Sequence, residues 1–322
     1  MCQVAFSLPS PPRDFICDRA RLVFPFLSFA TGYEALCAVP PIVPHYRGPS
    51  IVILDMGDNG KKVGLLAWKD ISNIWSHLIG ALQFLLGLLR FLHFHFSAMT
   101  SDRPLNMPDV AAVSVYYLCV VVCFALSTAF HTLSDHSAPL HRFGNQLDHL
   151  GIVLVMWGTG VSGTHFALRC APASLRILYF SAVTATAAGC AVFTLQPRFR
   201  TPSFRTARFL MYCFLGASLF APVVHAWRGF GGGEDGLAAV SAVMGLRSFL
   251  GLALVNFAGA AVYAARVPER WFPGTFDLLG QSHNWMHVLV FTGALIRLSG
   301  LLEVCDGWAA EGGLAVYCQG AN

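Results

Sequence analysis

Long apolar stretches recur along the chain from Ile71 onward, separated by short polar segments. Each stretch reaches about 20 residues, the length that an α-helix needs to cross the hydrocarbon core of a membrane. The pattern therefore predicts seven membrane-spanning helices. Their expected bounds are 71–93, 109–131, 147–169, 173–195, 206–227, 244–265 and 280–302.

Proline and glycine residues mark the breaks between these stretches. Pro139 and Gly144 precede the third span, and the glycines at 231–233 precede the sixth. The break at Pro172 is very short. The third and fourth spans should therefore form a tight antiparallel pair.

The first 69 residues lack a spanning stretch. Prolines interrupt them repeatedly, and the apolar segment Phe24–Phe29 is too short to cross a membrane. Early prolines and charges also differ from the pattern of a signal peptide. We expect an irregular cytosolic segment over 1–69, a transmembrane domain over 70–303, and a short non-cytosolic tail over 304–322.

Composition agrees with this membrane interpretation. Of the 322 residues, 55% are hydrophobic and 12% are charged, and the mean hydropathy is +0.58. A soluble domain carries about 25% charged residues, so most of this surface should face lipid. The expected fold is an all-α, seven-helix transmembrane bundle in the plasma membrane or an endomembrane. No basic run interleaved with aromatic residues suggests nucleic-acid binding.

The distribution of lysine and arginine predicts the orientation, because cytoplasmic loops carry the excess of these residues. The amino-terminal side of a seven-span chain holds Lys61, Lys62, Lys69, Arg142, Arg198, Arg200, Arg205, Arg208, Arg266 and Arg270. The opposite side holds or approaches Arg103, Arg169, Arg176, Arg228, Arg247 and Arg297. The amino terminus should therefore lie in the cytosol and the carboxyl terminus outside it.

The ten cysteines are scattered and form no CxxC pair, which argues against a thiolate zinc site. Several lie inside apolar spans, where a thiol behaves as a small hydrophobic group. A disulfide is expected, if anywhere, between Cys305 and Cys318 in the tail.

Ionisable residues gather at the predicted inner ends of three spans. His131 ends the second span, Asp148 begins the third, and His283 and His287 begin the seventh. The spacing of four residues places the last two rings on one helix face, one turn apart. Ser127 lies one turn deeper than His131 on the same face. The topology thus brings three histidines and one carboxylate to one membrane depth.

A plainer interpretation exists for each histidine alone, because histidines at helix ends commonly lie at the membrane interface without a ligand. His141, His149, His165 and His225 are assigned to that group, and His136 joins them although it is closer to the site. The combination of three histidines with an acid at one depth favours a metal, since ionisable groups inside membranes are costly and usually functional.

Three histidines and a water form an open zinc site, in which the metal lowers the pKa of the water to roughly 7. The sequence lacks the HExxH motif, because Asn284 follows His283. A general base must then come from another helix, and Asp148 is the best-placed carboxylate. This combination suits hydrolysis of an amide or ester in a lipid.

At these residues the chain resembles the progestin and adipoQ receptors, a family that includes adiponectin receptors, fungal Izh proteins and haemolysin III-like proteins. The matching stretches are NIWSHLIG at 73–80, SxxxHT at 127–132, HS at 136–137, LDHLGI at 147–152, PGTFD at 273–277 and QSHNWMHVLV at 281–290. Residues 1–60 match nothing in the pattern, and Trp68–Ser72 lacks the acidic motif usual before NIW.

The resemblance implies seven helices, a cytosolic amino terminus and a Zn²⁺ ion held by His131, His283 and His287. It gives Asp148 the role of contacting the zinc-bound water and places Ser127 beside it. It also implies ceramidase-like hydrolysis of a membrane lipid, linked to lipid signalling or to lipid and zinc balance. Partners in the family include sterols, steroids and extracellular proteins.

The residues are also compatible with other functions. A non-enzymatic receptor with structural zinc needs the same ligands. A metal or proton transporter is less favoured, because the polar cluster lies at one end rather than at the bilayer midplane. A bis-histidine haem protein would need facing histidines at two depths. A retinal protein is excluded, since no lysine follows Lys69.

Overall fold

The computed structural model describes residues 51–52, 66–97, 106–134, 136–200, 204–276, 279–309 and 314–319. Within them, seven helical segments are long and apolar enough to cross a membrane. The all-α, seven-span architecture predicted from hydropathy is therefore confirmed. The spans are Ile71–Phe96, Met107–Leu133, Ala138–Ala167, Ala173–Leu195, Leu210–Gly229, Leu246–Ala265 and Ser282–Ala309.

The helices follow one another with short connections. Their bounds are α3 Trp68–Ser97, α4 Met107–Leu133, α5 Ala138–Ala167, α6 Ala173–Leu195, α7 Arg205–Ser218, α8 Ala221–Gly229, α9 Gly233–Met244, α10 Leu246–Ala265 and α11 Ser282–Ala309. The 3-10 turns η3 and η5 cover Pro197–Arg200 and Leu314–Gln319. Before α3, the short strands β1 (Ile51–Val52) and β2 (Leu66–Ala67) pair antiparallel.

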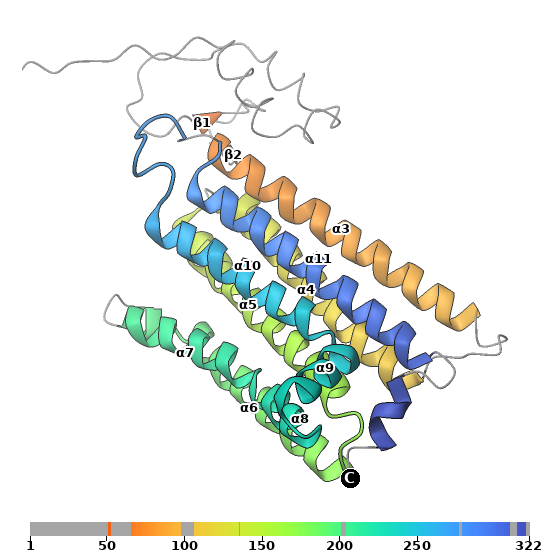
Figure 1. The fold of residues 1–322 in the computed structure, drawn as a ribbon. Helices are drawn as coiled ribbons and strands as arrows, with labels where there is room; N and C mark the ends of the chain where they lie inside the picture. Colours follow the sequence, from red (N-terminus) through yellow and green to blue (C-terminus); the bar gives the residue numbers. More distant parts are fainter. Residues whose placement is uncertain are drawn as a thin grey trace, which may run out of the picture.

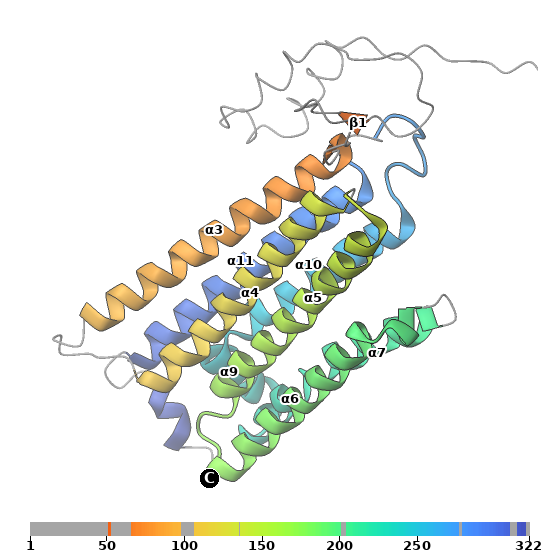
Figure 2. The same ribbon diagram turned by 180° about the vertical axis from the view of Figure 1, so that it is seen from behind.

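Helices α3, α4, α5, α10 and α11 run side by side, and α6 packs on the outer side of α5 with α7 beside it (Figures 1 and 2). The chain direction alternates, so α4 ends where α3, α5 and α11 begin. We call this the histidine end of the bundle, because it holds His131, His283 and His287. The opposite end, which holds Cys170 and Cys318, is called the disulfide end.

The interior is packed with large side chains while the outer faces remain apolar. Phe84, Tyr116, Phe124 and Phe166 are fully or almost fully buried. On the outside, Phe257 of α10 is 73% exposed. The outer faces carry many other exposed large apolar side chains, which is rare for a surface that faces water. These faces are therefore suited to lipid. The chain is an integral, multi-pass membrane protein.

Several boundaries differ from the hydropathy prediction, and those of α5 and α9 differ most. Helix α5 begins at Ala138, nine residues before the predicted third span, and it contains Pro139 and Gly144. Proline is tolerated there because the first turn needs no backbone donor, and Ser137 caps that turn by accepting from the Leu140 amide. Helix α9 was not predicted: it begins at Gly233, the last of the three glycines, and ends at Met244. Gly245 follows with a φ of +66°, which separates α9 from α10.

The disulfide differs from the expected pair. Cys318 bonds to Cys170, in the short connection between α5 and α6, with Cα atoms 4.9 Å apart. Cys305 is buried and carries a free thiol. The expected Cys305–Cys318 pair was wrong because Cys305 lies within α11, where its side chain faces the bundle interior.

A buried ionic cluster lies near the disulfide end. Asp109 of α4 is 1% exposed and accepts from His165 Nε2 at 2.7 Å and from Arg169. The Arg169 guanidinium also lies 4.4 Å from the centre of the Trp308 ring on α11. His165 is therefore a buried, paired residue and not the interfacial histidine that the sequence suggested. Its paired carboxylate explains how it is accommodated inside the bundle.

The amino-terminal segment is only partly described. Residues 1–50 and 53–65 lie outside the described ranges, so the irregular cytosolic segment over 1–69 stays a prediction. Asp277 of the PGTFD stretch also lies outside them. Helix α11 continues through the predicted boundary at residue 303 to Ala309.

Candidate metal centre

Three histidines from two helices converge at the histidine end. His131 occupies the last turn of α4, and His283 and His287 occupy the first two turns of α11. One nitrogen from each ring lies within 4.8 Å of the other two. His131 and His287 are buried, and His283 is partly exposed. Within the described residues, this cluster could hold a metal ion.

The local sequence explains the convergence. His283 and His287 are separated by one turn, so both rings lie on the same face of α11. Helix α4 runs in the opposite direction, and its last turn lies beside the first turns of α11. His131 therefore reaches the pair from the neighbouring helix, with ring centres 5.2 Å from His283 and 4.9 Å from His287.

The ring nitrogens of the three histidines are closely grouped. His283 Nε2 lies 3.3 Å from His131 Nε2 and 3.2 Å from His287 Nε2. A neutral imidazole nitrogen either donates one proton or offers one lone pair. The Nε2 of His283 can therefore make a good hydrogen bond to one neighbour, but not to both. A shared cation would be bound by all three lone pairs at once.

A fourth histidine, His77 of α3, packs against the cluster. Its ring centre lies 3.9 Å from that of His287, and its other side stacks on Phe124 at 4.6 Å. The sequence contained His77 within NIWSHLIG, but its spacing to the other histidines gave it no role. Its position depends on α3 packing against α4 and α11. His77 limits the directions that the His287 ring can adopt.

Asp148 lies on the face of α5 that packs against α4. A Cβ added to Gly144 would lie 3.0 Å from the Phe130 ring, and one added to Gly151 would lie 2.9 Å from Cys123 Cα. Asp148 is one turn from each glycine on the same face. It therefore stands opposite the turn of α4 that contains Ser127.

Ser127 is 1% exposed, and its hydroxyl has no hydrogen-bond partner among the described residues. It is one helical turn deeper than His131. The carboxylate of Asp148 is not part of the three-histidine cluster. Ser127 thus lies one turn deeper than His131 on α4, and Asp148 lies on the face of α5 that packs against this part of α4.

The first turn of α11 is held by polar contacts from other segments. Glu269, in the loop before α11, accepts from the Ser282 backbone amide at 2.8 Å and from the Ser282 hydroxyl. Burial by itself would raise the pKa of Glu269, but the Ser282 hydrogen bonds outweigh it and lower that pKa below the ordinary 4.5. These contacts fix the residue next to His283.

A buried amide pair completes this support. Asn284 donates to the Asn73 side-chain oxygen at 2.7 Å, and its own oxygen accepts from the Gly280 amide at 3.0 Å. Asn284 follows His283 directly, and Asn73 lies one turn before His77 on α3. The pair ties α3 to the start of α11, so the two helices that carry His77 and His283 are held in register.

Four further histidines stay outside the cluster. His136 and His141 are exposed, and His149 bonds through Nδ1 to the Asn145 carbonyl oxygen at 2.7 Å. His225 of α8 contacts the Tyr179 hydroxyl at 3.2 Å. None of them belongs to a metal-ligand group among the residues that the structure describes.

Fold and site together define a seven-helix integral membrane protein with a histidine cluster at one end of the bundle. The sequence profile of the haemolysin-III-related family matches residues 67–298. The chain belongs to this family. The match covers all three clustered histidines, Asp148 and Ser127.

Relatives in animals, fungi and plants carry related names. The chain is 31% identical over 239 residues to the adiponectin receptor protein of Drosophila melanogaster, covering 73% of this chain and 50% of the relative. It is 30% identical to the ADIPOR-like receptor IZH1 of Eremothecium gossypii, and the match covers 78% of this chain and 74% of the relative. It is 37% identical to the heptahelical transmembrane protein ADIPOR3 of Oryza sativa, and the match covers 53% of this chain and 41% of the relative.

The chain spans about half the length of the fly relative and of the progestin and adipoQ receptor-like protein 1 of Caenorhabditis elegans. The match to the ADIPOR-like receptor IZH2 of Saccharomyces cerevisiae covers 70% of the length of that relative. These names agree with the resemblance drawn from the motifs, including its fungal Izh branch. The chain is thus similar to adiponectin receptors and to their fungal and plant counterparts.

Proposed function

We propose that this protein is a zinc-dependent lipid amidase that cleaves the amide bond of a ceramide-like lipid. The spacing of the three histidine nitrogens carries the proposal. Zinc takes imidazole nitrogens at about 2.0–2.1 Å in a tetrahedron, so two ligands on one zinc stand about 3.3 Å apart. The two Nε2 separations of 3.3 and 3.2 Å fit this arrangement.

The donor set also fits. His131, His283 and His287 would supply three neutral imidazoles and leave one tetrahedral position open, as in catalytic zinc sites. Zinc, when bound, supplies a Lewis acid that makes water acidic near neutral pH. In this proposal Asp148 orients the attacking water and accepts its proton. The Ser127 hydroxyl, on the facing part of α4, would donate a hydrogen bond to the reacting carbonyl oxygen.

The lipid environment points to the substrate class. The proposed site lies between spanning helices, so a substrate that resides in the membrane can reach it laterally. Hydrolysis of an N-acyl sphingoid lipid consumes one water and yields a fatty acid and a free sphingoid amine. The amine leaves with a proton, which Asp148 is in position to return.

Metal content tests the ligand set. Purified wild-type protein should carry about one zinc per chain, and His283→Ala should lose it, because two ligands cannot replace the three-histidine site. His149→Ala is the matched control, since His149 is a helix-end histidine outside the cluster. Stable wild-type protein without zinc, or His283→Ala that keeps it, would contradict the proposal.

Turnover tests the catalytic role separately. Wild-type protein incubated with a ceramide should release fatty acid, and Asp148→Ala should release it roughly 100-fold more slowly or worse while retaining zinc. Asp235→Ala, which removes an exposed carboxylate from α9, should leave the rate unchanged. Release that is absent from zinc-loaded wild type, or undiminished in Asp148→Ala, would show that the amidase assignment is wrong.

The second candidate is a receptor in which the same zinc is structural. It is favoured by the fly, fungal and nematode relatives, whose names describe receptors. As a receptor, the protein would bind an extracellular protein, a steroid or another sterol. Chelation would then lower the melting temperature, ligand binding would be saturable, and no lipid would be hydrolysed. Metal or proton transport has less support, because the histidine cluster lies at one end of the bundle.

A further inference from the structure

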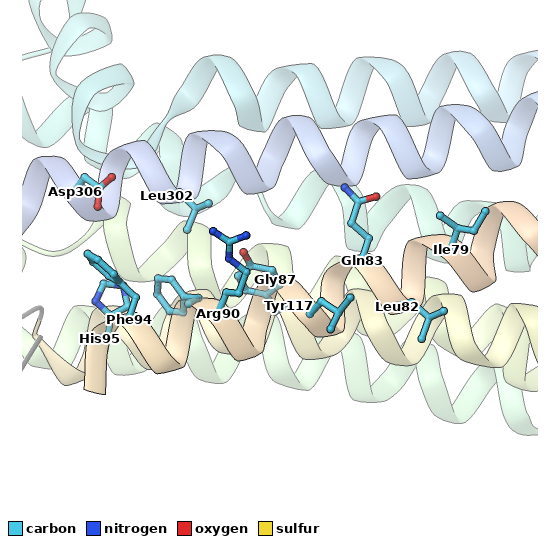
Figure 3. Close-up of a pocket in the computed structure, with 12 residues that line it drawn as sticks. Ile79, Leu82, Gln83, Gly87, Arg90, Phe94, His95, Tyr117, Leu302 and Asp306 are labelled. Carbon is cyan, nitrogen blue, oxygen red and sulfur yellow. The ribbon is translucent and has the colours of Figure 1, made fainter. Parts of the chain in front are cut away.

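A separate groove runs along the outside of the bundle between α3 and α11, with α4 forming its floor (Figure 3). It is an open, shallow groove with a volume of about 780 Å³. Most of its length is lined by apolar side chains of α3, including Ile79, Leu82 and Leu86. Leu86 is 61% exposed, so the groove opens towards the lipid.

Charged groups collect at one end of this groove. Arg90 lies on α3, and its side chain reaches towards Leu302 of α11 (Figure 3). Asp306 is one turn further along α11, and His95 of α3 lines the same end of the groove. The structure shows no ion pair for Arg90 within the described ranges. A cation and an anion thus face the same end of a mostly apolar groove, whose other polar lining residues are Gln83, His95 and Tyr117.

The apolar part of the groove, from Ile79 to Arg90, matches half of a bilayer in length. Ile79 and Arg90 are separated by a rise of about 16 Å at 1.5 Å per residue. The hydrocarbon core of a bilayer is about 30 Å thick, so the groove extends from one headgroup region to near the midplane. His77 lies about 20 Å from Arg90 along the same helix. The charged end therefore belongs to the leaflet opposite the histidine cluster.

We propose that this groove binds one zwitterionic phospholipid of that leaflet, with phosphatidylethanolamine preferred. Its phosphate pairs with the Arg90 guanidinium and its ammonium group pairs with the Asp306 carboxylate. One acyl chain lies along Leu86 and Leu82. The ethanolamine ammonium donates hydrogen bonds to a carboxylate, whereas a choline group has no N–H to donate. An anionic phospholipid would place its uncompensated charge beside Asp306.

Native mass spectrometry of the detergent-purified full chain tests this site. Phosphatidylethanolamine, phosphatidylcholine and phosphatidylglycerol with identical acyl chains are titrated separately. The wild type should retain phosphatidylethanolamine at about fivefold lower concentration than phosphatidylglycerol, and Arg90→Ala should lose about fivefold in its retention. Asp306→Asn should remove the preference for ethanolamine. Arg247→Ala, at an exposed arginine of α10 outside the groove, is the control.

A second pair of variants leaves the charges in place. Leu86→Trp fills the apolar part of the groove and should displace the bound lipid. Leu254→Trp adds the same ring to the outer face of α10, where Leu254 is 70% exposed. This control variant should not displace the bound lipid. His283→Ala should retain the lipid as the wild type does, so the outcome is independent of the metal centre.

Three results would overturn the proposal. The first is equal retention of the three lipids by the wild type. The second is a preference for phosphatidylglycerol, which would show that Arg90 acts without Asp306. The third is unchanged retention in both Arg90→Ala and Leu86→Trp. If Arg90→Ala does not fold, Arg90→Lys provides the comparison: it keeps the charge and should keep the lipid.

Discussion

Glu269 shows how a single residue outside the spans can control the metal centre. Its carboxylate accepts from the amide and hydroxyl of Ser282, at the first residue of α11. A negative charge at this position also interacts favourably with the amino-terminal end of the helix dipole. Because His283 is the next residue, the same contacts hold the metal-ligand turn in place.

Glu269→Gln should lower the melting temperature and weaken zinc binding. The pKa of Glu269 is lowered in the folded protein, so its contribution to stability is present above pH 4.5 and is lost as the pH falls through the lower folded pKa. The difference between wild type and variant should therefore shrink in that acid range. The measurement is the melting temperature of both proteins in detergent at a series of pH values from 7 to 3.

Glu303→Gln provides the control for this pH series, because Glu303 is exposed on the same helix. It should unfold like the wild type at every pH. A Glu269→Gln variant whose deficit stays constant as the medium becomes acidic would contradict the proposed charge effect.

At the scale of elements, the contact between α4 and α5 positions the catalytic candidates. Gly144, Gly151 and Gly158 lie seven residues apart on one face of α5 and meet Phe130, Cys123 and Cys119 of α4. Small residues permit such close approach of two helices in a membrane. The close approach brings Asp148 opposite the Ser127 turn. This geometry depends on both helices, which explains why neither sequence segment reveals it alone.

Gly151→Ala should separate α4 from α5, because its new Cβ would lie 2.9 Å from the Cys123 backbone. We expect a loss of about 1–3 kcal/mol in stability, the usual range for overpacking, and slower lipid hydrolysis with zinc retained. Gly189→Ala on α6 is the matched control, since nothing lies within 4 Å of its Cβ. Equal melting temperatures for the two variants would contradict the role of Gly151.

For the whole molecule, the disulfide bears on the orientation in the membrane. Cys170 and Cys318 meet at the end of the bundle opposite the histidine cluster. Disulfides persist in oxidising compartments and are rare in the cytosol. The lysine and arginine count independently assigns the histidine end to the cytoplasm. Both arguments predict a cytosolic amino terminus.

Glycosylation mapping measures this orientation. An acceptor site added after Asn322 should be glycosylated in a eukaryotic host, and one added before Met1 should not, because only the carboxyl terminus is expected in the lumen. Cys318→Ser is the companion variant: it should lower the melting temperature by breaking the link to Cys170. Glycosylation at the amino terminus would reverse the assignment of both membrane faces.

The sequence by itself determined the seven spans and the spacing of His283 and His287. Hydropathy over about 20 residues and the helical period are local properties, so they can be read without the partner helices. Alternation of the spans also predicted that His131 would lie at the same end as the pair. The resemblance to the receptor family rested on the same short motifs.

Only the tertiary structure decided which side chains meet. The ring contact of His77 with His287, the pairing of His165 with Asp109, and the bond between Cys170 and Cys318 each join segments far apart in the chain. Hydropathy indicates which segments enter the membrane, but not which helices pack together or which faces they share. Those choices depend on close packing between helices, to which residues from every span contribute.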